Sequence, residues 1–152
     1  NRVLAPLTNT AKENLKVWLN QNRMINDTVD ILDAKVVNYG VEYILKAHPS
    51  YEKNALLAQC NRLVSSTLAG TDNVLDIGEP LYISNIYTML NRLEGGLDVK
   101  SVKILPKEGT LYSDATFDFA DQRSADGTYI AVPENVVLEL KFPGTDIQGT
   151  IK

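Results

Sequence analysis

The first hydrophobic pattern along the chain is helical. Between residues 10 and 24, apolar side chains recur at helical spacing and share one face, formed by Leu15, Trp18 and Leu19. Thr10, followed three residues later by Glu13, has the spacing of a capping box, so the helix is predicted to begin there. The turn-forming residues 25–28 predict its end. Trp18 is predicted to face the core.

The pattern then changes to the alternation typical of a strand. Apolar residues take every second position at Val37, Tyr39, Val41, Tyr43 and Leu45. This alternation predicts a half-buried strand, because successive side chains point to opposite faces of a sheet. Upstream, the apolar positions shift by one residue to Leu32, Ala34 and Val36. Such a shift predicts either one long, bent strand or a pair of strands, and Gly40 is a second candidate break.

Two further helices are predicted, each followed by glycine. Ser50 is a candidate N-cap for the first, whose apolar face comprises Leu56, Cys60, Leu63, Val64 and Thr67, and Gly70 is its predicted stop. The second has an apolar face of Ile83, Ile86, Tyr87, Leu90 and Leu93. Gly95-Gly96 is predicted to end it, since glycine accepts a positive φ. Residues 97–105 return as a strand, with a change of parity at Lys100-Ser101.

Beyond Pro106 the pattern is β-rich. Ala115, Phe117 and Phe119 alternate with polar or small residues, and Asp126-Gly127 predicts a hairpin turn. In the strand near residue 140, one set of side chains is predicted to be buried: Val136, Leu138, Leu140 and Phe142. The set predicted to point outward comprises Val137, Glu139 and Lys141.

The order of these elements predicts an α+β fold. Helices are expected to pack on one face of a small mixed or antiparallel sheet, followed by a C-terminal β-rich segment. The predicted division is an α+β domain at residues 1–105 and a hairpin-rich extension at residues 106–152, which can share the same core.

Composition and charge narrow the classes of partner. The chain has 152 residues, 44% hydrophobic and 22% charged, so a core can form without disulfides or metal. A net charge of −4, with Lys and Arg scattered along the chain, disfavours nucleic acid as a partner. No apolar run is long enough to span a bilayer, so no membrane partner is expected. The abrupt start, without an initiator Met, predicts a fragment of a longer protein.

Residues that could carry chemistry are few and isolated. His48 is the only histidine, whereas catalytic triads and most zinc sites need one with partners, so a solvated loop residue is predicted. Cys60, the only cysteine, lies on an apolar helix face and is predicted to be a buried structural residue. Asp118 and Asp121 lack the spacing of an EF-hand loop and are predicted to solvate a hairpin tip. No catalytic, cofactor-binding or metal-binding residue is therefore predicted.

One stretch, residues 75–104, carries a family pattern. Its matching residues are Ile77-Gly78-Glu79-Pro80, Ser84, Ile86-Tyr87, Leu93, Gly95-Gly96, Asp98-Val99 and Val102. The stretch resembles the baseplate-J-like family of contractile-tail proteins, although Gly96 stands where many relatives have Val. Residues 31–59 resemble the upstream part of the same family. Residues 124–152 are similar to a C-terminal segment of baseplate wedge proteins in T-even-type phages.

The resemblance implies a structural protein without enzymatic activity. It implies the C-terminal part of a wedge protein that self-associates, helps to join wedges into the baseplate ring and transmits sheath contraction. The partners it implies are other copies of the chain, in a homodimer or ring contacts, and other wedge proteins. The implied location is the virion tail baseplate, reached after assembly in the host cytoplasm. No cofactor is expected.

Three functions remain open from the residues themselves. The first is a structural module that homodimerises, with a candidate interface at Tyr112, Phe117, Phe119, Val137, Glu139 and Lys141. The second is a domain that binds a small molecule or peptide, because a sheet with helices on one face leaves the other face free. The third is an enzyme that uses two carboxylates, as glycosidases do.

Overall fold

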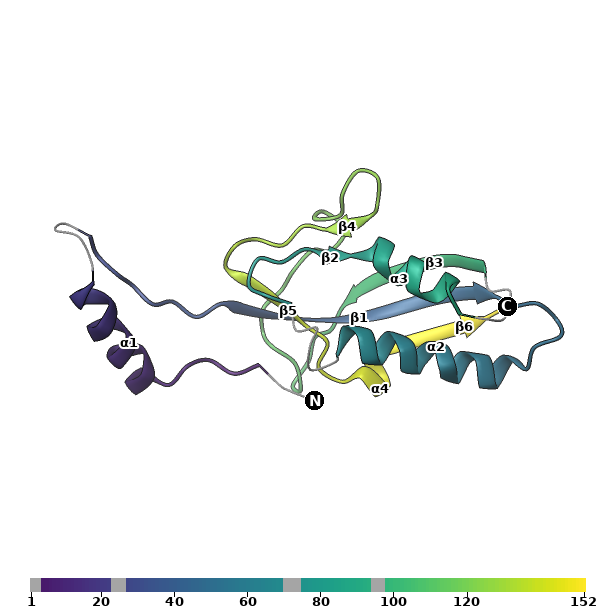
Figure 1. The fold of residues 1–152 in the computed structure, drawn as a ribbon, viewed down its shortest axis with the longest axis horizontal. Helices are drawn as coiled ribbons and strands as arrows, with labels where there is room; N and C mark the ends of the chain where they lie inside the picture. The colour runs from purple at the N-terminus through teal and green to yellow at the C-terminus, as the bar shows by residue number, and fades with distance from the viewer. Residues whose placement is uncertain (1–3, 23–26, 70–74, 94–97) are drawn as a thin grey trace.

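The computed structural model describes residues 4–22, 27–69, 75–93 and 98–152. They confirm the α+β fold: helices lie on one face of a mixed sheet, and an N-terminal arm extends beyond one end of it (Figure 1). The elements, in chain order, are α1 (Asn9–Gln21), β1 (Lys35–Lys46), α2 (Lys53–Leu68), β2 (Leu81–Tyr82), α3 (Ile83–Asn91), β3 (Asp98–Pro106), β4 (Tyr129–Ile130), β5 (Val136–Glu139), α4 (Pro143–Asp146) and β6 (Ile147–Ile151).

The long strand β1 is the centre of the sheet. On one edge it pairs with β3 in antiparallel orientation. On its other edge it pairs in parallel with two strands in succession, first with β5 through residues 35–38 and then with β6 through residues 41–45. The single turn α4 separates β5 from β6. The C-terminal stretch therefore completes the sheet that the N-terminal part of the chain begins. A short second ladder joins β2 and β4.

The alternation predicted for β1 is confirmed. Its five apolar residues from Val37 to Leu45 are at most 2% exposed, and they lie in the core cluster with α2 and α3. Glu42 and Ile44, on the opposite face, are only partly buried. Of the two arrangements left open, the structure has one strand. Leu32 precedes it in a segment without regular structure and is 87% exposed.

The parity change predicted in the following strand is a β-bulge. In the β1–β3 ladder Ile44 pairs with Ser101, whereas the next residue, Leu45, pairs with Val99. Lys100 is therefore the extra residue. A bulge of this kind shifts the side chains on either side of it to opposite faces, which produces the change of parity in the sequence.

The two central helices bury the predicted faces but one cap differs. Leu56, Cys60 and Val64 are the buried residues of α2, and Ile83, Ile86 and Leu90 are those of α3. The N-cap of α2 is Glu52 rather than Ser50, because the Glu52 carboxylate accepts from the backbone N–H groups of Asn54 and Ala55. The Ser50 hydroxyl is instead 2.7 Å from His48 Nδ1.

The β-rich expectation after Pro106 holds only in part. Residues 115–119 form no strand, although Phe117 and Phe119 pack against the core. The hairpin turn at Asp126-Gly127 is confirmed, since the Gly127 N–H donates to the Ser124 carbonyl and Arg123 bridges to Ile130 across the turn.

The first helix differs most from its prediction. Thr8, not Thr10, caps α1, and its hydroxyl accepts from the Ala11 N–H at 3.3 Å. Trp18 is 60% exposed, so the prediction that it faces the core is wrong. The reason is positional: α1 lies beyond the N-terminal end of β1, off the sheet (Figure 1).

Several predicted helix ends fall at positions outside the described residues. The stop predicted at Ile25 and the glycines Gly70, Gly95 and Gly96 lie at least in part outside the described residues. Among the helices that are described, none is both long and apolar enough to cross a membrane.

Candidate interaction surface

The arm comprises residues 4–22 and 27–34, and residues 27–34 form its stalk. Helix α1 is held against the stalk by two ion pairs, Lys12 with Asp33 at 2.5 Å and Lys16 with Asp30 at 3.3 Å. Both pairs are partly or largely exposed, and exposed ion pairs contribute little stability. Helix α1 runs beside the stalk and not over the sheet (Figure 1).

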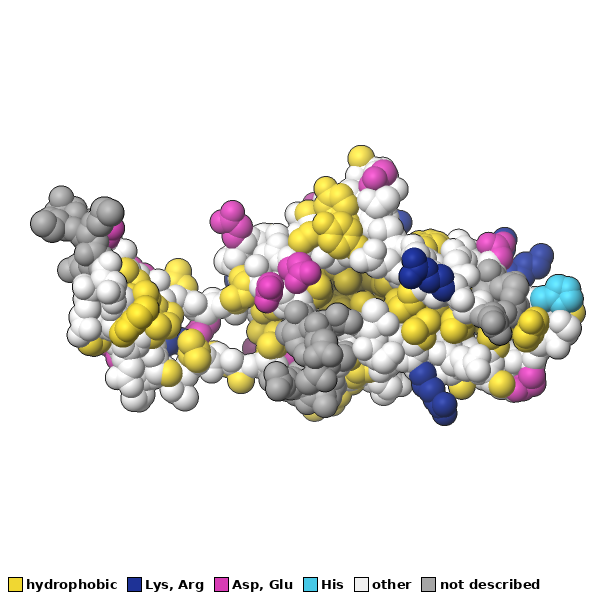
Figure 2. All heavy atoms as spheres, viewed as in Figure 1, with side chains coloured by type: hydrophobic (Ala, Val, Ile, Leu, Met, Phe, Trp, Pro, Cys, Tyr) yellow, Lys and Arg dark blue, Asp and Glu magenta, His cyan; other side chains and the backbone are white. Residues whose placement is uncertain are grey.

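The arm exposes an unusual share of the apolar surface. In the described part of the chain eleven large hydrophobic side chains are exposed, and five of them lie on the arm: Leu7, Leu15, Val17, Trp18 and Leu32. No residue of α1 is buried. Figure 2 shows hydrophobic side chains gathered on this helix. An apolar helix face that stays largely exposed is typical of a protein-interaction site.

The base of the arm is anchored to the sheet at two points. The Leu4 N–H donates to Glu139 Oε1 at 2.6 Å, and the Lys35 N–H donates to the Asn135 carbonyl at 2.8 Å. The other carboxylate oxygen of Glu139 accepts from Asn38 Nδ2 at 2.8 Å. A carboxylate buried in this way requires donors, because an unpaired buried charge is costly.

A polar network continues from this anchor towards α4. Asn38 Oδ1 accepts from the Ser113 N–H at 2.7 Å, which holds the segment after β3 against the sheet. Beside it, the buried Asp146 accepts from the Tyr112 hydroxyl at 2.6 Å and from the Phe142 N–H at 2.9 Å. The hydrogen bond to Asp146 raises the pKa of Tyr112. Every group has a structural partner, so the network ties distant segments together.

The structure buries half of the candidate interface. Phe119, Val137 and Glu139 are 5%, 6% and 7% exposed, so the prediction that Val137 and Glu139 point outward is wrong. All four residues of β5 are buried: Val136 and Leu138 belong to the core cluster, and on the polar side Leu4 bonds to Glu139 while Ser113 bonds to the neighbouring Asn38 of β1. Strict alternation between core and solvent therefore does not apply to β5.

The remaining candidate residues are partly buried and lie in two groups. Tyr112 packs edge-on against Phe142 at a centroid distance of 5.5 Å, and Lys141 Nζ lies 5.8 Å from the centre of the same ring. Phe117 packs against Phe119, with centroids 4.8 Å apart. That these residues contact a partner stays a prediction.

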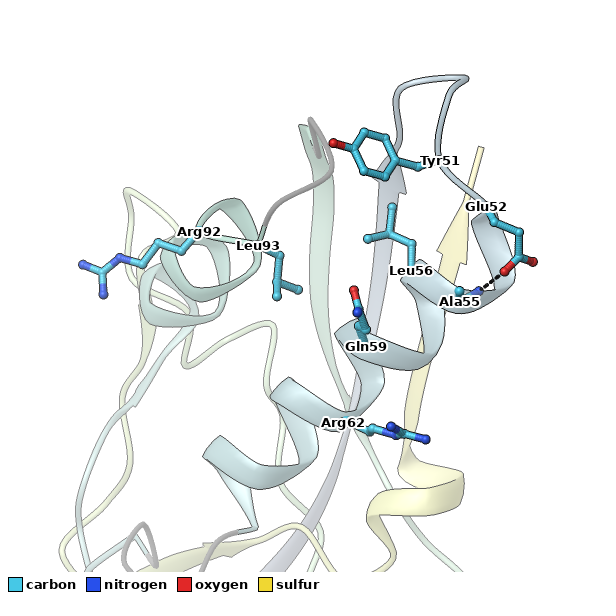
Figure 3. A pocket seen from close by; sticks show the side chains of 8 residues that line it. All are labelled: Tyr51, Glu52, Ala55, Leu56, Gln59, Arg62, Arg92 and Leu93. Carbon is cyan, nitrogen blue, oxygen red and sulfur yellow. Dashed lines mark hydrogen bonds between the residues drawn. The ribbon is translucent and has the colours of Figure 1, made fainter.

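A groove lies between α2 and the end of α3 (Figure 3). Its volume is about 720 Å³ and it is lined by Tyr51, Glu52, Ala55, Leu56, Gln59, Arg62, Arg92 and Leu93. In Figure 3 the Arg62 and Arg92 side chains point away from the groove, and Glu52 turns to the N–H of Ala55 at its own helix end. The polar groups do not converge on one point, as they would in a small-molecule site.

The residues that could take part in catalysis or metal binding make contacts that only support the fold. His48 is exposed, and its Nδ1 lies within hydrogen-bonding distance of the Ser50 hydroxyl at the start of the loop before α2. Cys60 is buried as predicted, and burial raises the pKa of its thiol. Asp118 accepts from the N–H groups of Ala120 and Asp121 in a turn. Within the described ranges, no cluster of three or more His, Cys, Asp or Glu side chains is placed to hold a metal ion.

The sequence pattern did not predict that the arm, with α1, forms an exposed surface. The helical spacing of Leu15 and Trp18 predicts that this face needs an apolar partner, and that inference does not depend on where the partner lies. The polar residues Asp27, Thr28 and Asp30 between α1 and β1 were the available signal that the helix is separated from the sheet.

In comparisons with known proteins, neither a protein-family model nor a curated protein matched this chain.

Proposed function

We propose that this chain is a structural interaction module of a phage tail baseplate wedge, which associates with copies of itself and helps to join wedges into the baseplate ring. On this proposal it has no catalytic role and transmits sheath contraction through its contacts. The proposal starts from the resemblance of residues 75–104 to the baseplate-J-like family and of residues 124–152 to wedge proteins.

The geometry of the Gly-Glu-Pro motif supports a role as a rigid joint. Gly78 has a φ of +77°, a conformation that favours glycine, and its N–H donates to the Val136 carbonyl at 2.8 Å. A Cβ at this position would lie 3.2 Å from the Glu134 Cα. Glu79 accepts from the Asp76 N–H at 2.7 Å and so closes the turn. The motif thereby fixes the entry to α3 against the start of β5.

The observation that carries the proposal is the exposed face of α1. Trp18 and Leu15 are 60% and 40% exposed, yet the helix is well formed and capped. Burying large apolar side chains is the main favourable term in protein association. A module that works by contact needs such a face, whereas an isolated domain gains nothing from it.

Mass measured as a function of concentration tests the proposal. Sedimentation equilibrium from low to high micromolar concentration is expected to show a rise from the 16.8 kDa monomer towards twice that mass. Raising the salt concentration should leave most of the association intact, because apolar contacts are not screened. A strict monomer over the whole range would contradict self-association.

A further inference from the structure

We propose that the arm of one copy docks in the α2–α3 groove of a second copy, and that the second copy's arm docks in the groove of the first. The result is a dimer with two-fold symmetry that is held together by exchanged arms. This inference rests on the proposed function, since it names the surfaces by which copies would associate.

The face that docks is defined by helical geometry. Ala11, Leu15 and Trp18 follow one another at spacings of four and three residues and therefore form one stripe along α1. Glu13 lies on the opposite side of the helix. The stalk is tied to α1 through Lys12 and Lys16 and leaves Leu15 and Trp18 exposed.

The arm is directed away from its own groove. Figure 1 places α1 beyond the N-terminal end of β1, whereas the groove lies over the first half of α2, towards the other end of the sheet. Folding back onto it would break both ion pairs to the stalk, and the bond from Leu4 to Glu139 limits how far the start of α1 can move. A second copy meets neither restriction.

The groove suits an apolar helix in size and chemistry. Its lining on α2 runs from residue 52 to 62, about 15 Å of helix, and α1 with 13 residues is about 20 Å long. Tyr51, Leu56 and Leu93 supply an apolar floor. Figure 2 shows hydrophobic side chains in the region between α2 and α3, with Lys or Arg side chains on either side.

Charges on the two partners are complementary. Arg62 and Arg92 lie at the edges of the groove, and the acidic lining residue, Glu52, is bonded to the N–H of Ala55 at its own helix end. On the arm, Asp30 and Asp33 flank the exposed Leu32, and their side chains remain 78% and 44% exposed even with their lysine partners. An apolar centre with oppositely charged rims is the usual arrangement of a specific protein interface.

The size of the interface favours exchange over a simple pairing of two α1 helices. A helix about 20 Å long and 10–12 Å wide covers roughly 200 Å² of a surface. Counted on both partners, one such contact buries roughly 400 Å², well short of the ~1,200–2,000 Å² that stable interfaces bury in total. Exchange makes the contact twice and adds Leu7 and Leu32 of each arm, so it comes closer to the required area.

Cross-linking between two different variants tests the exchange. Asn14→Cys lies beside the apolar stripe and Ala55→Cys lies in the groove, and both positions are exposed. When the two variants are mixed, equilibrated and treated with a short bis-maleimide, a product of twice the chain mass containing one of each is expected. The matched control is Glu13→Cys mixed with Ala55→Cys, because Glu13 faces away from the stripe. The unsubstituted chain controls for Cys60, which is buried.

The outcomes separate this inference from the proposed function. A dimer by mass without the Asn14→Cys to Ala55→Cys product overturns arm exchange and leaves self-association standing. A product formed by Asn14→Cys alone, without Ala55→Cys, also overturns it in favour of paired α1 helices. A strict monomer contradicts both proposals.

The single tryptophan gives an independent readout. Trp18 is the only tryptophan and is 60% exposed, so docking should shift its fluorescence to shorter wavelength as concentration rises. Tyr51→Ala in the groove is expected to raise the concentration at half-shift by roughly 10- to 100-fold. Tyr129→Ala, at an exposed position away from the groove, should leave it unchanged. A shift that does not depend on concentration, or a Tyr51→Ala variant that behaves like Tyr129→Ala, overturns the inference.

Discussion

At the residue scale, the close approach of the Tyr43 ring explains why position 149 is a glycine. Gly149 lies in β6 opposite Tyr43 of β1, and a Cβ there would overlap the Tyr43 ring. That ring cannot give way easily, since it is buried and its hydroxyl donates to Asn61 Oδ1 at 2.5 Å. The absence of a side chain at 149 therefore lets β6 lie beside β1 without displacing the core.

Gly149→Ala is accordingly expected to destabilise the fold by about 1–3 kcal/mol, the usual range for overpacking. Urea denaturation followed by circular dichroism would measure the change. Gly144→Ala is the matched control, because no atom lies within 4 Å of a Cβ at that position. Equal midpoints for the two variants would show that the Tyr43 ring moves freely.

Buried tyrosines predict how stability depends on pH. Burial raises the pKa of Tyr39 and of Tyr43, so the folded state retains protons that the unfolded chain loses. Their contribution to the stability of the folded state is fully present below a pH of about 10, the ordinary pKa of tyrosine, and is lost as the pH rises above it. Between about pH 8 and pH 11, the urea midpoint should fall less for Tyr39→Phe than for the unsubstituted chain. An identical loss would count against burial as the cause.

At the element scale, α1 and α3 have similar sequence patterns and opposite surroundings. Both carry an apolar stripe at helical spacing, but α3 buries Ile83, Ile86 and Leu90 whereas α1 buries no residue. The difference arises from the position of each helix relative to the sheet. Residues 27–34 carry the chain from α1 to the sheet without covering the stripe, while α3 lies directly against β3.

This contrast predicts unequal costs for truncation. In the monomer at low concentration, Trp18→Ala should change the free energy of unfolding by no more than about 0.5 kcal/mol, as expected for a surface position. Ile86→Ala, at a fully buried position, should cost about 2–5 kcal/mol. Urea denaturation of both variants measures the two costs. A loss of several kcal/mol for Trp18→Ala would mean that the arm packs on its own chain.

At the scale of the whole molecule, segments that are far apart in the sequence meet at one sheet. Glu139 in β5 joins Asn38 in β1 to Leu4 at the base of the arm. Further along, Ile147 and Ile151 of β6 align with Val41 and Leu45. Strands from residues 106–152 thus pair directly with β1. The division into domains at 1–105 and 106–152 stays a prediction.

Deleting residues 147–152 should therefore abolish cooperative thermal unfolding. The deletion removes a strand from the long edge of β1 and uncovers α2, which packs on it. Deleting residues 1–34 is the matched comparison. It should keep a cooperative transition but lower stability by about 1–3 kcal/mol, because Glu139 loses a donor. Circular dichroism during heating distinguishes the two, and a cooperative transition without β6 would contradict the shared sheet.

Much of this fold was predictable from local periodicity. The buried residues of β1, α2 and α3 were predictable because the angle between successive side chains is fixed by the backbone of a strand or helix. The bulge at Lys100 was predictable for the same reason, as a shift in parity. The caps were less so, since Thr8, Thr10, Ser50 and Glu52 are all able to cap and local spacing does not choose among them.

The sequence by itself determined which faces of this protein must be apolar, including the stripe with Leu15 and Trp18. Only the tertiary structure decided what covers each face. It placed Leu4 beside Glu139 and Ser113 beside Asn38, where both polar side chains are buried, and it set α1 apart from the core. The physical reason is that periodicity is a property of neighbouring residues, whereas burial depends on segments that lie more than a hundred positions away.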